Sequence, residues 1–289
     1  MNSIAFTIDE TTLAKMKKFY ASDSIPCDDA GIIFKAQVIG CVITIKEDLE
    51  VVFDGVRAND VAGTWQKKTN KKVKEEVMTG PCRQTHLGSD DIGVADYFGP
   101  ICTVSCCVEE KDIDFLYELG VQNARTMTNA QIIDTARAIK DKIQYSLLIL
   151  DNPHYNKMVK DGINTAHIRA KLHNQAMTNM MQRLERPVDL KYVEHFVASK
   201  TFYNYLKDEV VVVKNLQFEK NSHQNYIAVA CAYVLAKYAY LQYFTNMSRS
   251  LKVKLPYGTG TTVNEVATTL IKARGKDILN KVAKLHMSN

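Results

Sequence analysis

Residues 88–100 read Gly-Ser-Asp-Asp-Ile-Gly-Val-Ala-Asp-Tyr-Phe-Gly-Pro, and the run at 101–108 that follows them reads Ile-Cys-Thr-Val-Ser-Cys-Cys-Val. The second run is short, apolar and rich in β-branched residues, which predicts a buried strand. Two adjacent carboxylates, Asp90 and Asp91, therefore stand beside a core strand and a glycine-containing turn. Such a pair suits a hard divalent cation, which takes oxygen ligands. A bare Asp-Asp pair is more often a solvated turn, so further residues must decide between the two interpretations.

Composition places the chain among ordinary globular proteins: its 289 residues are 46% hydrophobic, enough for one large domain or two smaller ones. The net charge of +5 permits a polyanionic partner without demanding one. Seven cysteines show no CxxC or zinc-type spacing, which favours buried free thiols in a reducing compartment. The first residues lack a signal segment, and we expect no apolar run long enough to span a membrane. The sequence therefore predicts a cytoplasmic protein without membrane contact.

The first 66 residues predict a small α+β module. A short strand is expected at 4–8, and a helix opens at Asp9 with acidic residues in its first turn. Three further strand-like runs, at 31–38, 41–46 and 50–53, are joined by hairpin-like connections. A short helix is expected at 58–65.

Residues 67–80 differ in character, because five lysines fall within positions 67–74 and are followed by Glu75 and Glu76. We interpret this stretch as a basic linker or exposed helix between two domains. A solvated connector explains it without further function. Lysines close to a bound duplex would also add affinity through counterion release.

Residues 81–289 alternate strands and helices, the pattern of an α/β domain. Thr128 is a candidate N-cap, with Gln131 three residues on as part of a capping box. The segment 152–156 is expected to be a turn that leads into a helix from Lys157. The expected strands lie at 101–108, 146–150, 189–193 and 210–213, and the main helices at 129–143, 163–184, 199–206, 226–244 and 263–284.

Cleavage of a phosphodiester by bound metal ions needs several carboxylates that converge from different elements. Asp90 and Asp91 supply one corner of such a site. Glu194 follows the strand at 189–193, and active groups gather at strand ends in α/β sheets. By itself, a single glutamate at a strand end is most simply a solvated side chain.

Taken whole, the stretch 88–100 resembles the first signature of the ribonuclease HIII family of type 2 ribonucleases H, which usually reads Gly-Ser-Asp-Glu-Val-Gly-Thr-Gly-Asp-Tyr-Phe-Gly-Pro. The resemblance implies an RNase H-like α/β catalytic domain at 81–289. Other segments resemble the family in the same order along nearly the whole chain: 152–156 (Asn-Pro-His-Tyr-Asn), 172–176 (Leu-His-Asn-Gln-Ala), 192–196 (Tyr-Val-Glu-His-Phe), 228–239 and 282–286 (Val-Ala-Lys-Leu-His).

Residues 1–66 resemble the N-terminal domain of the same family, through 16–20 (Met-Lys-Lys-Phe-Tyr), 34–36 (Phe-Lys-Ala) and 40–44 (Gly-Cys-Val-Ile-Thr). The resemblance implies a small α+β fold similar to the TATA-box-binding protein, which serves as a substrate-binding module. An exposed sheet face with Lys35, Thr44 and Lys46 is the candidate surface for contact with a duplex.

The resemblance implies Asp90, Asp91 and Glu194 as catalytic metal ligands, with Mg²⁺ or Mn²⁺ as the cofactor. It places His223 at the position of the family's fourth acid, and Glu219 is the nearest acidic residue. The family carries Asp, Glu, Asp and Glu at these four places, so only the first is unchanged. Imidazole suits softer ions than Mg²⁺, which predicts a preference for Mn²⁺.

Gly93, Val94 and Ala95 occupy the family's Gly-x-Gly segment, whose backbone senses the 2′-hydroxyl of the ribose. Ala95 replaces the second glycine. A side chain there restricts the turn if its φ is positive and is harmless if φ is negative.

The function that the resemblance implies is endonucleolytic hydrolysis of the RNA strand of RNA/DNA hybrids by a monomeric, metal-dependent ribonuclease. A degenerate homologue that binds hybrid or duplex without efficient cleavage is the alternative. A metal-dependent phosphatase, or a nuclease of other specificity, fits the carboxylates but not the other motifs.

Overall fold

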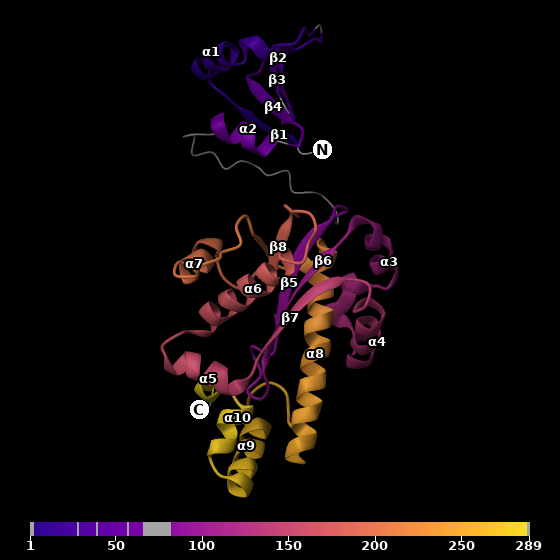
Figure 1. Ribbon diagram of the computed structural model, residues 1–289, viewed down its shortest axis with the longest axis vertical. Helices are drawn as coiled ribbons and strands as arrows, with labels where there is room; N and C mark the ends of the chain where they lie inside the picture. Colours follow the sequence, from indigo (N-terminus) through magenta and orange to yellow (C-terminus); the bar gives the residue numbers. More distant parts are fainter. Residues whose placement is uncertain (1–2, 28, 39, 57, 66–81, 288–289) are drawn as a thin grey trace. The chain divides into compact units, whose positions relative to one another are not determined.

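The computed structural model describes residues 3–27, 29–38, 40–56, 58–65 and 82–287 (Figure 1). The chain divides into two compact units, 1–79 and 80–289, each with its own hydrophobic core. The basic linker expected at 67–80 lies outside the described residues.

The first unit is a four-stranded antiparallel sheet, in the order β1-β4-β3-β2, with two helices. Alternate strand residues such as Ile43 and Phe53 are buried together with Met16 of the first helix and Ala62 of the second. Both helices therefore cover the same face of the sheet, as expected for a small α+β module. The elements are β1 (Ser3–Thr7), α1 (Glu10–Phe19), η1 (Ala21–Asp23), β2 (Ile32–Val38), β3 (Cys41–Lys46), β4 (Glu50–Asp54) and α2 (Ala58–Trp65).

The other face of this sheet carries short and polar side chains. Lys35, Thr44, Val52 and Ala5 are successive cross-strand partners and form one row across all four strands. The Lys35 ammonium lies 3.6 Å from the carboxylate of Asp29, so its charge is partly balanced within the unit.

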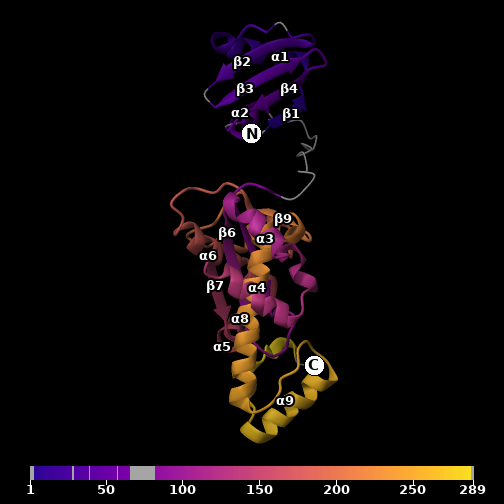
Figure 2. The same cartoon turned by 90° about the vertical axis from the view of Figure 1, so that its right-hand side faces the viewer.

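The second unit is built on a five-stranded sheet in the order β7-β6-β5-β8-β9. Strands β5 (His86–Ile92), β6 (Ile101–Val108) and β7 (Gln144–Leu150) are antiparallel, whereas β8 (Lys191–Glu194) and β9 (Gln217–Glu219) run parallel to β5. One face is covered by α6 (Thr165–Met181) and the other by α8 (Ile227–Leu251), as Figures 1 and 2 show. This arrangement of a sheet with helices on both faces is the α/β architecture predicted for residues 81–289.

The remaining elements surround this sandwich. Helices α3 (Ile113–Glu118) and α4 (Asn129–Ile139) lie on the α8 side (Figure 1). The predicted capping box of Thr128 and Gln131 opens α4. The other helices and 3-10 turns are α5 (Asn152–Lys160), α7 (Ser199–Tyr205), α9 (Thr261–Arg274), α10 (Asp277–Val282), η2 (Glu110–Asp112), η3 (Val121–Thr126), η4 (Ser222–Gln224) and η5 (Leu285–Met287).

Helix α8 approaches strand β5 closely because Gly88 has no side chain. A Cβ atom at this position would lie 2.2 Å from the backbone nitrogen of Val229 and 2.3 Å from the carbonyl carbon of Ala228. The N–H of Ala228 donates to His86 Nε2 at 3.1 Å, which satisfies one of the unpaired donors at the start of the helix. Strand β5 thus determines how closely α8 packs against the sheet and where the helix begins.

Helix α8 is long and apolar enough to cross a membrane, by length and composition alone. The expectation that no apolar run has this length is therefore wrong. The helix is apolar around most of its circumference because the second unit encloses it, and 67% of its most apolar window is buried. It is the central core helix of a folded domain.

Two predicted segments differ from the structure. Residues 152–156 form the first turns of α5 rather than a loop, because Asp151 accepts the N–H of His154 at 3.1 Å and Pro153 occupies the first turn. The strand predicted at 210–213 is irregular. The Asn174 side chain bonds the backbone of that segment at Val211 and Val213, and these contacts replace a strand ladder.

The segment that leaves β5, residues 93–99, is held by groups from distant parts of the chain. Lys284 is fully buried and donates to the carbonyls of Asp96 at 2.8 Å and Gly99 at 2.6 Å. Asn152 also donates to Gly99, at 3.0 Å, and the Tyr240 hydroxyl donates to the Asp96 carboxylate at 2.7 Å. The signature stretch is therefore fixed at its turn as well as in its strand.

Candidate active site

Strand β5 carries Asp90 and Asp91 on opposite faces of the sheet, because consecutive strand residues point to opposite sides. Asp90 shares the face of Gly88 and points toward η3 and η4, on the α8 side. Asp91 shares the face of Ser89 and points toward α6. Two carboxylates that are adjacent in the sequence therefore belong to two different side-chain clusters.

Asp90 and Glu194 meet at a guanidinium. The Arg125 Nη2 atom lies 2.6 Å from Asp90 Oδ2 and 3.7 Å from Glu194 Oε2. His223 completes the group, since its Nδ1 atom lies 3.6 Å from Glu194 Oε2 and 3.4 Å from Arg125 Nε. The structure thus brings together three of the four predicted ligands, from β5, the end of β8 and η4.

Glu194 is the last residue of β8 and is held in a fixed orientation. Its Oε1 atom accepts the backbone N–H of Asn221, and its Oε2 atom accepts the hydroxyl of Ser222, both at 2.9 Å. Glu219, the nearest acid to His223 in the sequence, is the cross-strand partner of Glu194 on β9, and its Oε1 atom accepts the hydroxyl of Tyr226 at 2.7 Å. The Tyr226 hydroxyl therefore holds the Glu219 carboxylate.

Burial dominates the electrostatics of this group. Desolvation raises the pKa of the Asp90 carboxyl to about 8, and the Arg125 charge only partly opposes this effect. Desolvation and the same Arg125 charge lower the pKa of His223 below its ordinary value. The pKa of His223 therefore lies below 6.5, and the neutral ring predominates at pH 7.

Asp91 is committed to an ion pair on the other face. Arg169 donates to both of its carboxylate oxygens at 2.7 Å, and the guanidinium lies 4.0 Å from the ring centroid of Phe196. His173 is fully buried beside it, bonded to Ser89 through Nδ1 at 2.7 Å. Burial raises the pKa of Asp91, but His173 and Arg169 outweigh it and hold this pKa below its ordinary value.

The donor set around Arg125 suits a divalent cation. In the part of the chain that the structure describes, no three acidic, His or Cys side chains are gathered closely enough to hold an ion as they stand. Asp90, Glu194 and His223 nevertheless all contact one cationic group, and two carboxylates with a neutral imidazole are ligands that Mg²⁺ or Mn²⁺ accepts. The residues therefore fit the metal that the sequence led us to expect.

The predicted ribose-sensing segment follows directly after this site. Gly93 has φ of +93°, and a Cβ atom there would lie 2.2 Å from the carbonyl oxygen of Pro100, so this position requires glycine. Val94 packs partly buried against a small apolar cluster. Ala95 is exposed and lies outside the positive-φ region, so its methyl group does not strain the turn.

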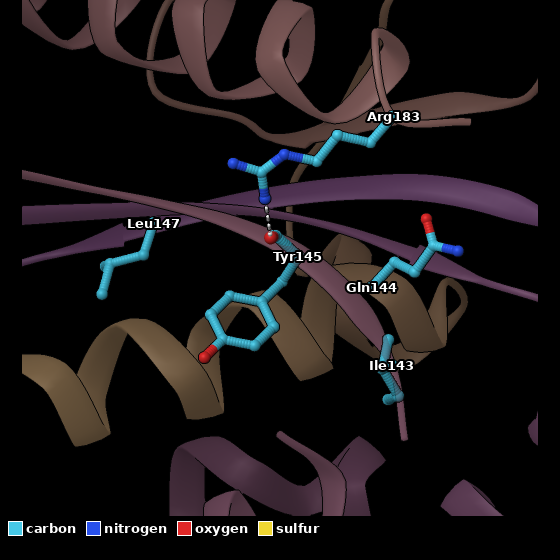
Figure 3. Close-up of a pocket in the computed structure, with 5 residues that line it drawn as sticks. All are labelled: Ile143, Gln144, Tyr145, Leu147 and Arg183. Atoms are coloured by element: carbon cyan, nitrogen blue, oxygen red, sulfur yellow. Dashed lines mark hydrogen bonds between the residues drawn. The ribbon is translucent and has the colours of Figure 1, made fainter. Parts of the chain in front are cut away.

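A surface hollow elsewhere on the second unit carries no comparable chemistry. Figure 3 shows it at the start of β7, where the Arg183 guanidinium donates to the carbonyl of Tyr145 at 3.0 Å. Its lining contains no carboxylate and no histidine: Ile143, Gln144, Tyr145, Leu147 and Arg183. A second cavity, of about 240 Å³, adjoins the Asp90 group and is lined by Gln122, Asn123, Arg125, Thr126, His223 and Gln224.

Sequence reasoning missed the two arginines that organise these clusters. Arg169 stands four residues before His173, so helical spacing alone would have placed both on one face of α6. Arg125 lies in a 3-10 turn between α3 and α4. No pattern in the sequence marks it, because its role depends on how η3 packs against η4.

Known proteins resemble this chain over nearly its whole length. The family model described as Ribonuclease HII matches residues 87–289, and a domain of unknown function (DUF3378) matches residues 3–77. Ribonuclease HIII of Bacillus mycoides (strain KBAB4) is 34% identical over 100% of this chain and 96% of its own length, and that of Bacillus subtilis (strain 168) is 31% identical with the same coverage. The crystal structure of Bst-RNase HIII in complex with Mn²⁺ superposes with a TM-score of 0.71 and 25% identity, over 99% of this chain and 96% of that one.

Proposed function

We infer that this chain, which belongs to the ribonuclease HIII family, is an endonuclease that hydrolyses the RNA strand of RNA/DNA hybrids with a divalent metal, Mg²⁺ or Mn²⁺. The observation that carries this conclusion is the convergence of Asp90, Glu194 and His223 on one cationic group at the ends of neighbouring parallel strands. Nothing in the comparisons favours a degenerate, non-cutting homologue.

Asp90 and Glu194 are the proposed metal ligands, with His223 as a further ligand through its neutral ring. When bound, divalent cations activate a water molecule and stabilise the oxygen that leaves the phosphorus. The protein fixes the ligands: Ser222 and the Asn221 N–H hold Glu194, and burial keeps bulk water away from Asp90. Asp91 remains a predicted ligand, and to act as one it must release Arg169.

Substrate contacts are proposed at two places. The backbone of Gly93, Val94 and Ala95 lies directly after the Asp90 strand, where it is suited to sense a ribose 2′-hydroxyl. The row that includes Lys35 and Thr44 on the open sheet face of the first unit is proposed to bind the duplex. In this proposal residues 1–66 form a substrate-binding domain, joined by the linker 67–80 to a catalytic domain at 81–289.

We also propose that the protein acts as a monomer in the cytoplasm. Six cysteines are free thiols, at positions 27, 82, 102, 106, 107 and 231, which suits a reducing compartment. Size-exclusion chromatography with light scattering measures the oligomeric state directly, and a dimer mass at micromolar concentration would contradict the proposal.

The function is tested with an end-labelled RNA/DNA hybrid resolved on a denaturing gel. We expect the wild-type protein to cut the RNA strand with Mg²⁺ or Mn²⁺ and not in EDTA, and to leave an all-DNA duplex intact. The variant Asp90→Asn keeps the side-chain shape but removes a charged ligand, so it should not cut. Wild-type activity in Asp90→Asn would show that the metal is held elsewhere.

A further inference from the structure

Arg125 contacts Asp90, Glu194 and His223, the three proposed ligands that lie together on one side of the sheet. It donates to Asp90 Oδ2 at 2.6 Å, lies 3.7 Å from Glu194 Oε2, and approaches His223 Nδ1 to 3.4 Å through Nε. We propose that Arg125 is a positioning residue that competes with the divalent cation for these atoms, and so sets the affinity of the active site for metal. The inference rests on the proposed function, because it takes Asp90 and Glu194 as metal ligands.

The competition follows from how few lone pairs remain. Asp90 Oδ1 accepts the backbone N–H of Asp91 at 2.8 Å, so only Oδ2 faces the group, and Arg125 occupies it. Both oxygens of Glu194 already accept a hydrogen bond from Asn221 or Ser222. A metal–carboxylate bond is shorter than the contact that Asp90 makes with the guanidinium, and a metal ion and a guanidinium on the same buried oxygen repel each other strongly.

The surroundings of Arg125 leave room for its guanidinium to move away from Asp90. The Arg125 side chain is 37% exposed, and its guanidinium lies 4.6 Å from the ring centroid of Tyr233 at the edge of the 240 Å³ cavity. Gln122, which lines this cavity, carries a buried amide oxygen with no hydrogen-bond partner among the described residues. A displaced Arg125 therefore has solvent and this cavity to move into.

The second arginine of the region shows the contrast. Arg169 makes two bonds to Asp91, is 20% exposed and is covered by Phe196. A buried bidentate pair of this kind is expensive to open. Arg125 makes one bond to Asp90 from a more exposed position. The metal therefore displaces Arg125 from Asp90 more readily than it displaces Arg169 from Asp91.

The test is the affinity of the full-length chain for Mn²⁺ without hybrid, measured by titration calorimetry and by the electron paramagnetic resonance signal of free Mn²⁺. Two variants remove the competing charge: Arg125→Ala, and Arg125→Gln, which keeps a polar side chain if alanine disturbs folding. Both should bind Mn²⁺ about tenfold more tightly than the wild type, a change of about 1.4 kcal/mol. Arg137→Ala is the matched control, because Arg137 is an exposed arginine of α4 that pairs only weakly with Asp134.

Circular dichroism of each variant confirms that it is folded. Equal or weaker Mn²⁺ binding by both Arg125 variants than by Arg137→Ala would overturn the inference. Hybrid cleavage by the wild type is measured separately. Hybrid cleavage by the wild type, without a gain in Mn²⁺ affinity in the Arg125 variants, would contradict the role of Arg125 and leave the proposed function supported. Tighter Mn²⁺ binding by the Arg125 variants, together with a wild type that does not cut the hybrid, would support the role of Arg125 and contradict the proposed function.

Discussion

Asp90 and Asp91 are neighbours in the sequence, yet their carboxyl groups have opposite pKa shifts because they lie on opposite faces of the sheet. Burial pushes the Asp90 carboxyl toward its neutral form, with a pKa of about 8, whereas Asp91 is held charged by Arg169 and His173. A carboxyl whose folded-state pKa is raised contributes stability that is present at low pH and is lost as pH rises through that value. The fold therefore loses stability toward neutral pH, because folding must keep a proton on Asp90 that the unfolded chain releases.

Asp90→Asn should therefore stabilise the protein in EDTA while it abolishes cleavage. The amide carries no charge to desolvate, so we expect a higher melting temperature than wild type at pH 7–9, by a few degrees, and little difference at pH 5. Cleavage should fall on the order of 10³-fold or more. Thermal unfolding across this pH range checks the prediction, and a lower melting temperature for the variant at pH 8 would contradict it.

His223→Glu should restore tolerance for Mg²⁺. The change returns an oxygen ligand and a negative charge beside Glu194, and hard cations prefer both. We expect the ratio of Mn²⁺-supported to Mg²⁺-supported cleavage to fall by roughly tenfold, the scale of changes around a metal site. His167→Glu, in the first turn of α6, adds the same charge away from the site. An unaltered ratio in His223→Glu would remove His223 from the ligand set.

Lys284 should make stability depend on alkaline pH. Burial lowers its pKa from 10.5 to about 8, so the folded state binds fewer protons than the unfolded state between these values. Its unfavourable contribution is complete below pH 8 and is relieved as pH rises toward 10.5, by at most about 3 kcal/mol. Lys284→Met should lack this gain. Denaturant unfolding of both proteins at pH 7, 8.5 and 9.5 measures the difference, and parallel curves would refute it.

At the scale of elements, sequence patterns predicted most helices and strands, because buried apolar residues recur with the period of a helix or of a strand. The strand at 101–108 and the helix at 199–206 agree with the structure to within one residue. The strand predicted at 210–213 failed because Asn174, 36 residues away, takes up the backbone groups that a neighbouring strand would have used. Arg125 was missed for the same reason, since its partners come from three different elements.

Gly88→Ala tests the contact between α8 and β5. The added methyl carbon would meet backbone atoms of α8 at 2.2 Å, so helix and strand must separate along the core. We expect a loss of about 3 kcal/mol or more in the free energy of unfolding. Gly120→Ala is the control, because its φ is +71° but no atom lies within 4 Å of the added carbon; its strain costs about 1 kcal/mol. Equal losses in a denaturant titration would show that the close approach is not required.

For the whole molecule, the division of labour between the two units is the remaining question. The proposed catalytic groups belong to the second unit, which alone matches the Ribonuclease HII model. The open sheet face of the first unit carries Lys35 and Lys46, each paired with a carboxylate. If this face binds the duplex as proposed, it would add binding energy that is equal in the ground state and the transition state, and would change affinity more than turnover.

Deleting residues 1–66 should therefore raise the dissociation constant for an RNA/DNA hybrid by roughly tenfold or more, the equivalent of one or two lost phosphate contacts, while single-turnover cleavage at saturating hybrid stays within a few-fold of wild type. In the full-length chain, Lys35→Glu on the open sheet face should also weaken hybrid binding. Lys15→Glu makes the same change of charge on α1, which covers the opposite face, and should leave hybrid binding unchanged. Affinity is measured by fluorescence anisotropy with Ca²⁺ in place of the catalytic metal, at matched salt. If Lys35→Glu and Lys15→Glu weaken binding equally, the effect is long-range charge and the open face is not the contact surface. If the deletion leaves affinity unchanged, the first unit does not bind the substrate.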